Sequence, residues 1–233
     1  MNFVLATTNE GKIKEISDLF KDYTVFPMPN IGYEIDENGE TFYENALIKA
    51  RAVQSFLAKS ESDRGERNDR GNKGDRGDKG SNDNGGNMGD VSIGNASNMN
   101  DVKNIILADD SGLVIDALGG KPGVRSADFL GYSTPFSVKN DGILQLLADV
   151  PMQNRTAHFV TVIVGLMPNG EIKTALGTLS GLISLEPKGV FGFGYDPIFF
   201  VPKIGKTLAE MRMDEKNQIS HRALALRQLR EYF

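Results

Sequence analysis

Two adjacent carboxylates, Asp109 and Asp110, follow directly on the apolar run 105–108 and precede Ser111. Like charges side by side at the end of a buried-looking strand are unfavourable unless a positive group lies next to them. The pattern therefore predicts a cation beside this strand end. Because successive side chains of a strand point to opposite faces, the two carboxylates are expected to differ in role.

A second set of carboxylates lies in residues 36–44, where Asp36, Glu37, Glu40 and Glu44 occur together. Exposure to solvent or helix capping accounts for most acids in such a run. A carboxylate in the loop before a helix is also a typical Mg²⁺ ligand, since Mg²⁺ sites use one or two carboxylates per ion. Both interpretations stay open from the residues alone.

Residues 7–12, with the sequence TTNEGK, could bind phosphate. They join an apolar strand to a helix, and a helix N-terminus presents free N–H groups and a partial positive charge to an anion. Thr7, Thr8 and Asn9 add donors, and Lys12 adds a charge. The G-x-x-x-x-G-K spacing of a Walker A loop is absent. An ordinary strand–helix turn is the alternative.

Residues 192–197, GFGYDP, could contact a planar ring. They combine glycines with two aromatic residues and Asp196. One interpretation is a tight loop whose aromatics belong to the core. The other is a stacking surface for a base, with a carboxylate or backbone edge beside it.

Residues 214–223 place Lys216, His221 and Arg222 around the start of the last predicted helix. Donors at this position could read an acceptor on a ligand. The only other histidine, His158, lies inside a strand pattern and is expected to be structural.

Hydrophobic periodicity predicts the elements that must position these motifs. Thr41 and Glu44 have the spacing of a capping box, and Ser220 is a predicted N-cap. The expected strands are 2–8, 23–28, 104–110 and two within 156–184 around a Pro-Asn-Gly turn; the expected helices are 11–20, 41–59, 137–150 and 220–233. This alternation predicts a mixed α/β sheet, in two lobes with a cleft between them.

Residues 60–101 differ in composition from the rest of the chain. They contain nine glycines, eight asparagines, seven aspartates and no aromatic residue, so they have little apolar surface to offset the entropy of ordering. The interpretation is a disordered surface insertion within one domain that spans 1–233. The alternative is a tether for an anionic partner through its arginines, although its acids outnumber its bases.

The bulk composition excludes several classes of function. The chain has 233 residues, no cysteine and a net charge of -5. The lack of cysteine removes disulfides and thiolate chemistry, and the acidic balance argues against a general nucleic-acid-binding surface. No apolar run approaches the ~20 residues of a membrane span, and residues 1–12 lack a signal-peptide pattern. We therefore expect a cytoplasmic protein without a nucleic-acid or membrane partner.

Taken together, these motifs resemble those of the inosine/xanthosine triphosphate pyrophosphatase family, whose members hydrolyse non-canonical purine nucleoside triphosphates. Six blocks match in order along the chain outside 60–101: LATTNEGK (5–12), E-x-G-x-TFYENALIKA (37–50), ADDSGL to SA (108–127), FGYDPIFF (193–200), GKTLAEM (205–211) and EKNQISHRALAL (215–226). The resemblance implies a mixed α/β fold with a long twisted sheet, flanking helices and two lobes around a central cleft. It also implies a homodimer.

The reaction that the resemblance implies splits ITP, dITP or XTP into the monophosphate and pyrophosphate, with Mg²⁺ as cofactor. Glu37 and Asp110 would be the metal ligands, and Asp110 would also be the catalytic proton acceptor. Asp110 would then face the cleft, while Asp109 makes a supporting hydrogen bond.

The substrate-binding residues that the resemblance implies come from four of the motifs. Those expected to hold the phosphates are Thr7, Thr8, Asn9, Gly11 and Lys12; those expected to contact the rest of the substrate are Ser111, Phe193, Gly194, Tyr195, Asp196, Lys216, His221 and Arg222. Residues 193–196 would stack on the base and read its edge, and 221–222 would select the 6-keto group. The chain departs from the family at Arg125 and Asp128, where many members have Tyr and Arg. Asp128 is expected to weaken any phosphate contact from that loop.

Two alternatives differ in function from this expectation. One is a pyrophosphatase of similar architecture for modified pyrimidine nucleotides, against which the motifs at 193–196 and 220–222 argue. The other is a catalytically silent nucleotide-binding regulator, against which the intact Glu37, Asp110 and Lys12 argue.

Overall fold

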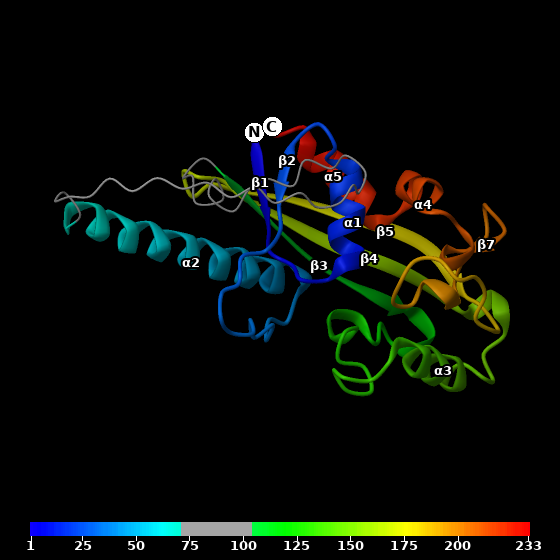
Figure 1. Cartoon of the computed structure of the whole chain (residues 1–233). Coiled ribbons are helices and arrows are strands. Elements are labelled where there is room, and N and C mark those ends of the chain that lie inside the picture. Colours follow the sequence, from blue (N-terminus) through cyan, green and yellow to red (C-terminus); the bar gives the residue numbers. More distant parts are fainter. Residues whose placement is uncertain (71–103) are drawn as a thin grey trace, which may run out of the picture.

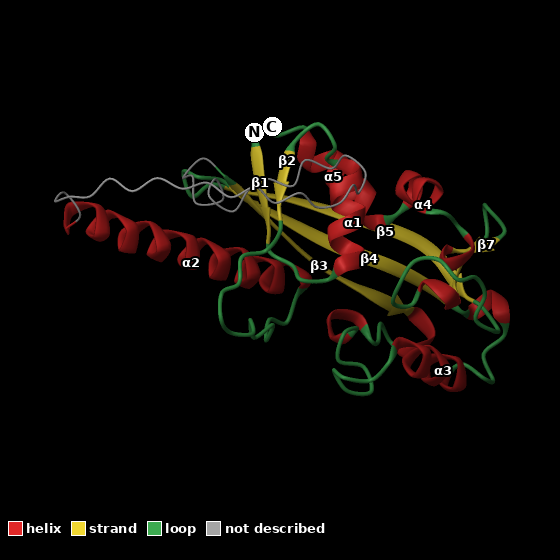
Figure 2. Cartoon of the chain, in the orientation of Figure 1, coloured by secondary structure: helices red, strands yellow, loops and turns green. Residues whose placement is uncertain are grey.

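The computed structural model describes residues 1–70 and 104–233, and for residues 61–70 only the backbone. Its centre is a mixed sheet with the strand order β2-β1-β3-β4-β5-β6-β7 (Figures 1 and 2). The strands are β1 (Asn2–Leu5), β2 (Thr24–Phe26), β3 (Ile105–Ile115), β4 (Thr156–Leu166), β5 (Ile172–Ile183), β6 (Phe199–Val201) and β7 (Lys206–Thr207). Strands β2, β1 and β3 run parallel, and the other neighbours are antiparallel. The mixed α/β sheet expected from the sequence is confirmed.

Helices flank both faces of this sheet (Figure 2). They are α1 (Glu10–Leu19), α2 (Phe42–Arg70), α3 (Phe136–Leu146), α4 (Met213–Ile219) and α5 (His221–Arg230). Phe3 of β1 packs with α1 and α5, whereas its neighbour Val4 packs with α2. Because neighbouring side chains of a strand point to opposite faces, these two cores lie on opposite sides of the sheet. None of the described helices combines the length and hydropathy that crossing a bilayer requires.

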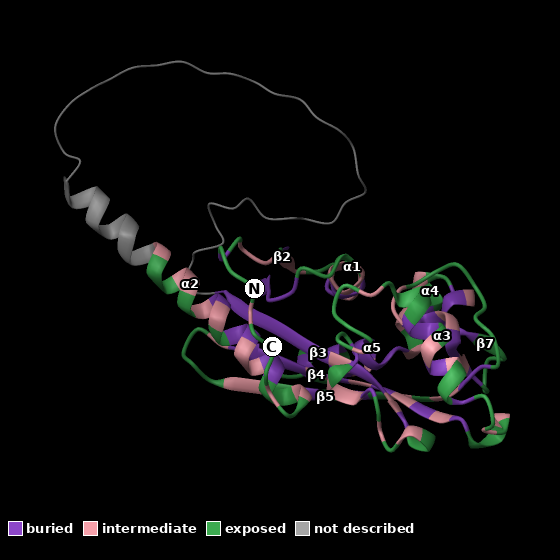
Figure 3. Cartoon of the chain, turned by 90° about the horizontal axis from the view of Figure 1, so that it is seen from below, coloured by how far each residue is buried: buried purple, intermediate pink, exposed green. Residues whose placement is uncertain are grey.

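The far ends of the long strands form a third core. Leu113 and Phe159 of β3 and β4 pack there with Ile143 of α3 and with Phe199 of β6. Figure 3 shows how the buried residues follow the long strands from one end of the molecule to the other. Separate cores at the two ends of shared strands give the expected two lobes.

Local signals begin the helices where the sequence predicts. Thr41 Oγ1 accepts from the N–H of Glu44 at 3.1 Å, and Glu44 Oε2 accepts from the N–H of Thr41 at 3.0 Å, which completes the capping box. Ser220 caps α5 by accepting from the N–H of Ala223 at 3.1 Å. The short elements β7 and α4 are not predicted, because two and seven residues carry too little periodicity to be recognised.

Helix α2 continues to Arg70, beyond residue 59 where the predicted helix ends. The backbone of 60–70 is therefore helical, although this stretch was expected to belong to a disordered insertion. Most of the predicted insertion, residues 71–101, lies outside the described residues, and its disorder stays a prediction.

Strand β3 has a free edge beyond the end of β1. On β3, strand β1 pairs only with Ile105 to Leu107. Between Ala108 and the isolated bridge of Val114 with Pro122, β4 is the only strand beside β3 among the described residues. The chain leaves β1 toward α1 on one face of the sheet, and α2 packs on the other face. Strand order reverses at this point, and open α/β sheets bind ligands at the carboxyl ends of such strands. The carboxylate pair 109–110 lies on this free edge.

Candidate active site

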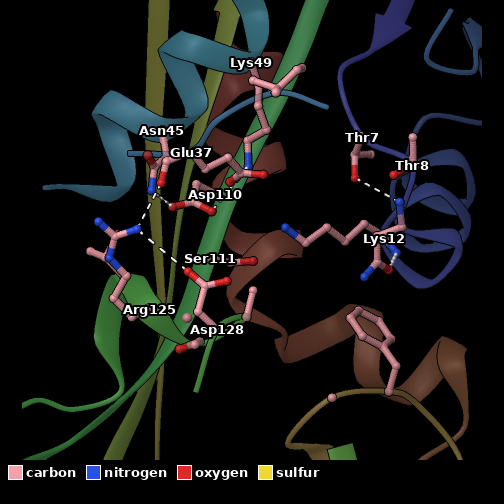
Figure 4. A pocket seen from close by; sticks show the side chains of 18 of the residues that line it. Thr7, Thr8, Lys12, Glu37, Asn45, Lys49, Asp110, Ser111, Arg125 and Asp128 are labelled. Carbon is pink, nitrogen blue, oxygen red and sulfur yellow. Dashed lines mark hydrogen bonds and ion pairs between the residues drawn. The ribbon is translucent and has the colours of Figure 1, made fainter. Parts of the chain in front are cut away.

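A cavity of about 730 Å³ opens at the free edge of β3 (Figure 4). Its lining comes from the β1–α1 turn, the loop before α2, α2 itself, β3, the loop before α3, and residues 193–196 and 216–222. The cavity therefore brings together segments that lie far apart in the sequence. Every predicted site residue lines it except Gly11, which lies behind the wall.

Asp109 is buried and faces away from the cavity toward α1 and α5. Its Oδ2 lies 3.1 Å from Lys12 Nζ and 3.2 Å from Arg222 Nε, and it accepts from Ser111 Oγ at 3.3 Å. Burial alone raises the pKa of Asp109, but Lys12 and Arg222 outweigh it and hold the pKa well below the ordinary value. Asp109 is thus a permanent anion that holds two cations in place.

Asp110 lines the cavity and has different partners. Asn45 Nδ2 donates to its Oδ2 at 3.2 Å, and Lys49 Nζ lies 3.3 Å from its Oδ1. Burial raises the pKa of Asp110, and the neighbouring Lys49 and Lys12 offset only part of that rise. The two carboxylates thus differ as strand alternation predicts, with pKa values shifted in opposite directions.

The positive charge beside the carboxylates comes from the protein's own side chains. Lys49 Nζ lies 2.6 Å from Glu37 Oε2 as well as 3.3 Å from Asp110 Oδ1, so it bridges the two expected metal ligands. Burial lowers the pKa of Lys49, but Asp110 and Glu37 outweigh this and raise it, so the ammonium stays charged. The sequence motifs predict Mg²⁺ at this position, and the structure also places the Lys49 ammonium there.

The same arrangement fits a divalent cation that arrives with a phosphate group. Glu37 and Asp110 direct carboxylate oxygens at one cationic point, and oxygen donors suit Mg²⁺. No group of three His, Cys, Asp or Glu with ligand geometry occurs among the described residues. Mg²⁺ sites of nucleotide enzymes commonly use one or two carboxylates and complete the shell with water and substrate phosphate.

The β1–α1 turn forms the phosphate-binding candidate. Asn9 Oδ1 accepts from the N–H of Lys12 at 3.1 Å, and Thr7 Oγ1 accepts from the N–H of Asn9 at 3.2 Å. These two bonds shape the turn so that the start of α1 faces the cavity beside the Lys12 ammonium. A helix N-terminus and a lysine together favour an anion.

Gly11 has a packing role in this turn. A Cβ at this position would lie 2.4 Å from the Phe193 ring. The absence of a side chain therefore lets Phe193 pack against the first turn of α1. Gly11 is not among the described residues that line the cavity, and its expected contact with phosphate stays a prediction.

Phe193 presents its ring to the cavity, with cations beside it. Lys216 Nζ lies 4.6 Å and the Arg222 guanidinium 5.8 Å from the ring centroid. Asp196 Oδ2 accepts from Lys216 Nζ at 2.6 Å and from the N–H of Phe193 at 2.8 Å, which fixes the loop. A ring with donors around it is suited to a purine base.

Tyr195 anchors this loop and does not offer its ring for stacking. It is 3 % exposed, its hydroxyl donates to the carbonyl of Ser126 at 2.8 Å, and its ring packs edge-on against Phe136. The expectation that residues 193–196 stack on a base therefore applies to Phe193, and Tyr195 holds the loop that carries it.

His221 and Arg222 lie at the inner end of the cavity. The His221 ring stacks on Phe159 at 4.8 Å, and burial together with Arg222 holds the pKa of His221 well below its ordinary value. The imidazole is therefore neutral at pH 7. Among the described residues its Nδ1 has no hydrogen-bond partner.

Arg222 is held by three groups of the protein. It donates through Nε to Asp109, through Nη1 to Glu15, and through Nη2 to Ser111 Oγ at 3.1 Å. Its side chain is 2 % exposed. The expected contact between Arg222 and the base can therefore use only the guanidinium N–H groups that do not take part in these three bonds.

Sequence reasoning misses three polar residues that contact the candidate site residues: Glu15, Asn45 and Lys49. Asn45 and Lys49 are one turn apart on the same buried helix face as Ala46 and Ala50. Polar residues at core positions of an amphipathic helix are the signal that could have identified them. Their partner Asp110 lies 65 and 61 residues away, so the contact itself cannot be read from local sequence.

Comparisons with known proteins show which proteins this chain resembles. The family model described as "Ham1 family" matches residues 3–63 and 72–232. Among curated relatives, the "dITP/XTP pyrophosphatase" of Desulforamulus reducens is 38 % identical over 99 % of this chain and 94 % of its own. That of Bacillus subtilis is 37 % identical over 97 % and 93 %.

Solved structures give the same result. The Ham1 protein of Staphylococcus aureus has a TM-score of 0.70 and 31 % identity, and covers 100 % of this chain and 97 % of its own. A HAM1 protein from Coxiella burnetii has a TM-score of 0.72 and 32 % identity, over 100 % and 98 %. With a family model over nearly its whole length and relatives of this similarity, the chain belongs to the Ham1 family.

Proposed function

We propose that the protein hydrolyses non-canonical purine nucleoside triphosphates, namely dITP, ITP and XTP, to the monophosphate and pyrophosphate. The observation that carries this proposal is a single cavity whose two ends are lined by different kinds of side chain. One end has two carboxylates and Lys49, and the other has the Phe193 ring with Lys216 and Arg222. The names of the relatives, dITP/XTP pyrophosphatases, support the same substrates and reaction.

The chain's own cations favour the reaction by neutralising the triphosphate. Phosphate oxygens repel an attacking nucleophile, and charge builds on the leaving pyrophosphate. Lys12 and the N-terminus of α1 lie on one side of the cavity and Lys49 on another. Because Asp109 and Glu37 already hold these lysines, little reorganisation is needed when the charge develops.

Asp110 is proposed to orient the attacking water and accept its proton. Asp110 lines the cavity, and the hydrogen bond from Asn45 fixes its position. Attack at the α-phosphorus then releases the monophosphate directly.

Mg²⁺ is proposed as the cofactor, with Glu37 and Asp110 as its protein ligands. When bound, the ion supplies positive charge to the phosphate oxygens as a Lewis acid. Lys49, which bridges the two carboxylates, would then shift its contact toward phosphate. Titration of Mn²⁺, followed by electron paramagnetic resonance, tests the ligand set without turnover. Glu37→Gln should weaken this binding, and unchanged binding would contradict the assignment.

Base selection is proposed to depend on donors at the inner end of the cavity. Hypoxanthine and xanthine have an acceptor at O6, whereas adenine has an amine there. A protein donor that faces this amine is left unpaired, at a cost of about 1–3 kcal/mol. Arg222, Lys216 and His221 are the proposed donors.

The experiment that tests the function measures pyrophosphate release with Mg²⁺ over dITP, ITP, XTP, GTP, ATP, dUTP and dTTP. We expect kcat/KM for the first three to exceed that for ATP by at least about tenfold, since each unpaired donor costs that much. Preference for dUTP would favour the pyrimidine alternative. Binding without turnover of any substrate would indicate the regulator.

Assembly and location follow from the same proposal. We propose a homodimer that works in the cytoplasm, where the nucleotide pool lies, without a nucleic-acid partner. Light scattering after size-exclusion chromatography tests the dimer, and fractionation of cells tests the location. A mass of about 25.4 kDa in solution, that of one chain, would contradict the dimer.

A further inference from the structure

Among the described residues, five lysine and arginine side chains line the cavity, and Arg125 differs from the other four. Lys12, Lys49, Lys216 and Arg222 are at most 15 % exposed. Each of these four also has a carboxylate oxygen within 3.2 Å. The Arg125 side chain is 56 % exposed, and its carboxylate partner Asp128 lies 3.8 Å away. Arg125 is therefore the cation of the cavity that is most available to a ligand.

Arg125 lies at the end of the cavity that holds the two carboxylates. Its Nη1 donates to the carbonyl oxygen of Glu37 at 3.1 Å, while the Glu37 carboxylate contacts Lys49. Glu37 thus contacts both Arg125 and Lys49, and it connects Arg125 to the proposed metal ligands. In Figure 4, Arg125 and Lys12 lie on opposite sides of Asp110 and Ser111. Arg125 is absent from the contacts around the Phe193 ring, where the base is proposed to lie.

The partner of Arg125 can be exchanged at little cost. Asp128 is 50 % exposed, and an ion pair of two exposed groups contributes little stability in water. A phosphate group carries more charge than a carboxylate, and its oxygens match the fork of a guanidinium. The anchor on Glu37 uses only one N–H of the five, so the remaining donors can contact a ligand.

We propose that Arg125 binds the pyrophosphate portion of the substrate and that Asp128 competes with this portion for the guanidinium. The inference rests on the proposed function and adds a substrate contact that is specific to this chain. Loss of Arg125 then weakens pyrophosphate binding, whereas loss of the Asp128 charge strengthens it. A purely structural role for the pair predicts no such opposite signs.

Product inhibition separates the two portions of the substrate. The conversion of isotope-labelled ITP to labelled IMP is followed by chromatography at fixed free Mg²⁺. Either pyrophosphate or an excess of unlabelled IMP is added as the inhibitor. For Arg125→Ala we expect the inhibition constant of pyrophosphate to rise about tenfold, the usual effect of a lost charge-assisted hydrogen bond, and that of IMP to stay within about twofold. Asp128→Asn should lower the constant for pyrophosphate about threefold, an effect typical of an exposed charge pair.

Two further variants act as controls. Arg125→Lys keeps the charge but not the fork, so it should recover part of the affinity for pyrophosphate. Arg230→Ala removes an exposed arginine that pairs with Asp22 outside the cavity, and both inhibition constants should stay unchanged. Thermal unfolding of each variant checks that the fold is intact.

Three results would overturn the proposal: an unchanged pyrophosphate constant in Arg125→Ala, equal effects on IMP and pyrophosphate, or weaker pyrophosphate binding in Asp128→Asn. Failure of the proposed function is a separate outcome, seen as absence of turnover in the unmodified protein. In that case calorimetric titration of the same variants with Mg²⁺–pyrophosphate still tests Arg125.

Discussion

Asp109 and Asp110 are adjacent and chemically identical, and the groups around them give them different properties. Lys12 and Arg222 hold the pKa of Asp109 below its ordinary value, whereas burial raises the pKa of Asp110. A depressed pKa means that the ionised form stabilises the fold, and a raised pKa means that it destabilises it. Asp109 therefore contributes to structure, and Asp110 is held in an unfavourable state that suits a catalyst.

Replacement of each carboxylate by its amide tests this difference. Asp110→Asn should reduce kcat by about a thousandfold, the usual size of a lost acid–base contribution, with an unchanged or higher melting temperature. Asp109→Asn is the matched control one residue away. It should lower the free energy of unfolding by about 3 kcal/mol, because two buried cations lose their partner. The turnover of ITP measures the loss of activity in each variant, and urea unfolding measures the loss of stability. Equal destabilisation of the two variants would contradict the different roles of Asp109 and Asp110.

Glu15 provides a pH-dependent contribution to stability. Burial raises its pKa, but Arg222 and Lys216 outweigh this, so the pKa is lowered in the fold. A carboxylate with a lowered folded pKa stabilises the fold above its unfolded pKa of about 4.3, and this contribution is lost as the pH falls through the folded value. Glu15→Gln should cost about 3 kcal/mol at pH 7. The difference in the free energy of unfolding between wild type and variant, measured by urea unfolding, should become smaller below pH ~4.3. A difference that does not change with pH would contradict the ion pair.

At the scale of elements, α1 and α2 approach the free edge of β3 from two faces, and each provides one lysine of the cavity, Lys12 and Lys49. The sequence predicts both helices, the capping box of α2, and the motifs that line the cavity, but not that Asn9 caps α1. It does not predict that Lys49 bridges Glu37 and Asp110, or that Glu15 binds Arg222, which lies 207 residues away. Local patterns specify which residues form an element, but long-range partners depend on how the elements cross.

The contact between α1 and the loop at 193 provides a test at this scale. Gly11→Ala places a methyl group against the Phe193 ring, at a position where alanine otherwise favours the helix by about 1 kcal/mol. The ring must move, and loss of stacking should raise KM for ITP about tenfold. Steady-state kinetics together with a melting curve separates the two effects. An unchanged KM would show that the ring position is unimportant for the substrate.

On the scale of the whole molecule, two lobes share the strands β3, β4 and β5, and the cavity lies where their cores meet. The described residues that line it belong to 6–49 and 110–222. Because the sequence predicts that 60–101 is an insertion separate from the core, we expect the composition of 71–101 to have no effect on the reaction.

Exchange of residues 71–101 for a Gly-Ser linker of equal length tests that expectation. It changes composition without changing the distance that the chain can span. We expect kcat/KM for ITP to stay within about twofold, because the groups that contact the substrate are untouched. A large loss, with α2 still helical by circular dichroism, would assign a role in the site to this segment.

The free edge of β3 also bears on aggregation. A strand edge without a neighbour is a template for pairing with another chain, and natural sheets protect such edges with charged residues. Between Ala108 and Gly112, β3 has such an edge, and the buried Asp109 and Asp110 lie on it. The segments that line the cavity cover this edge. The walls that shape the cavity for chemistry therefore also shield the sheet from edge-to-edge association.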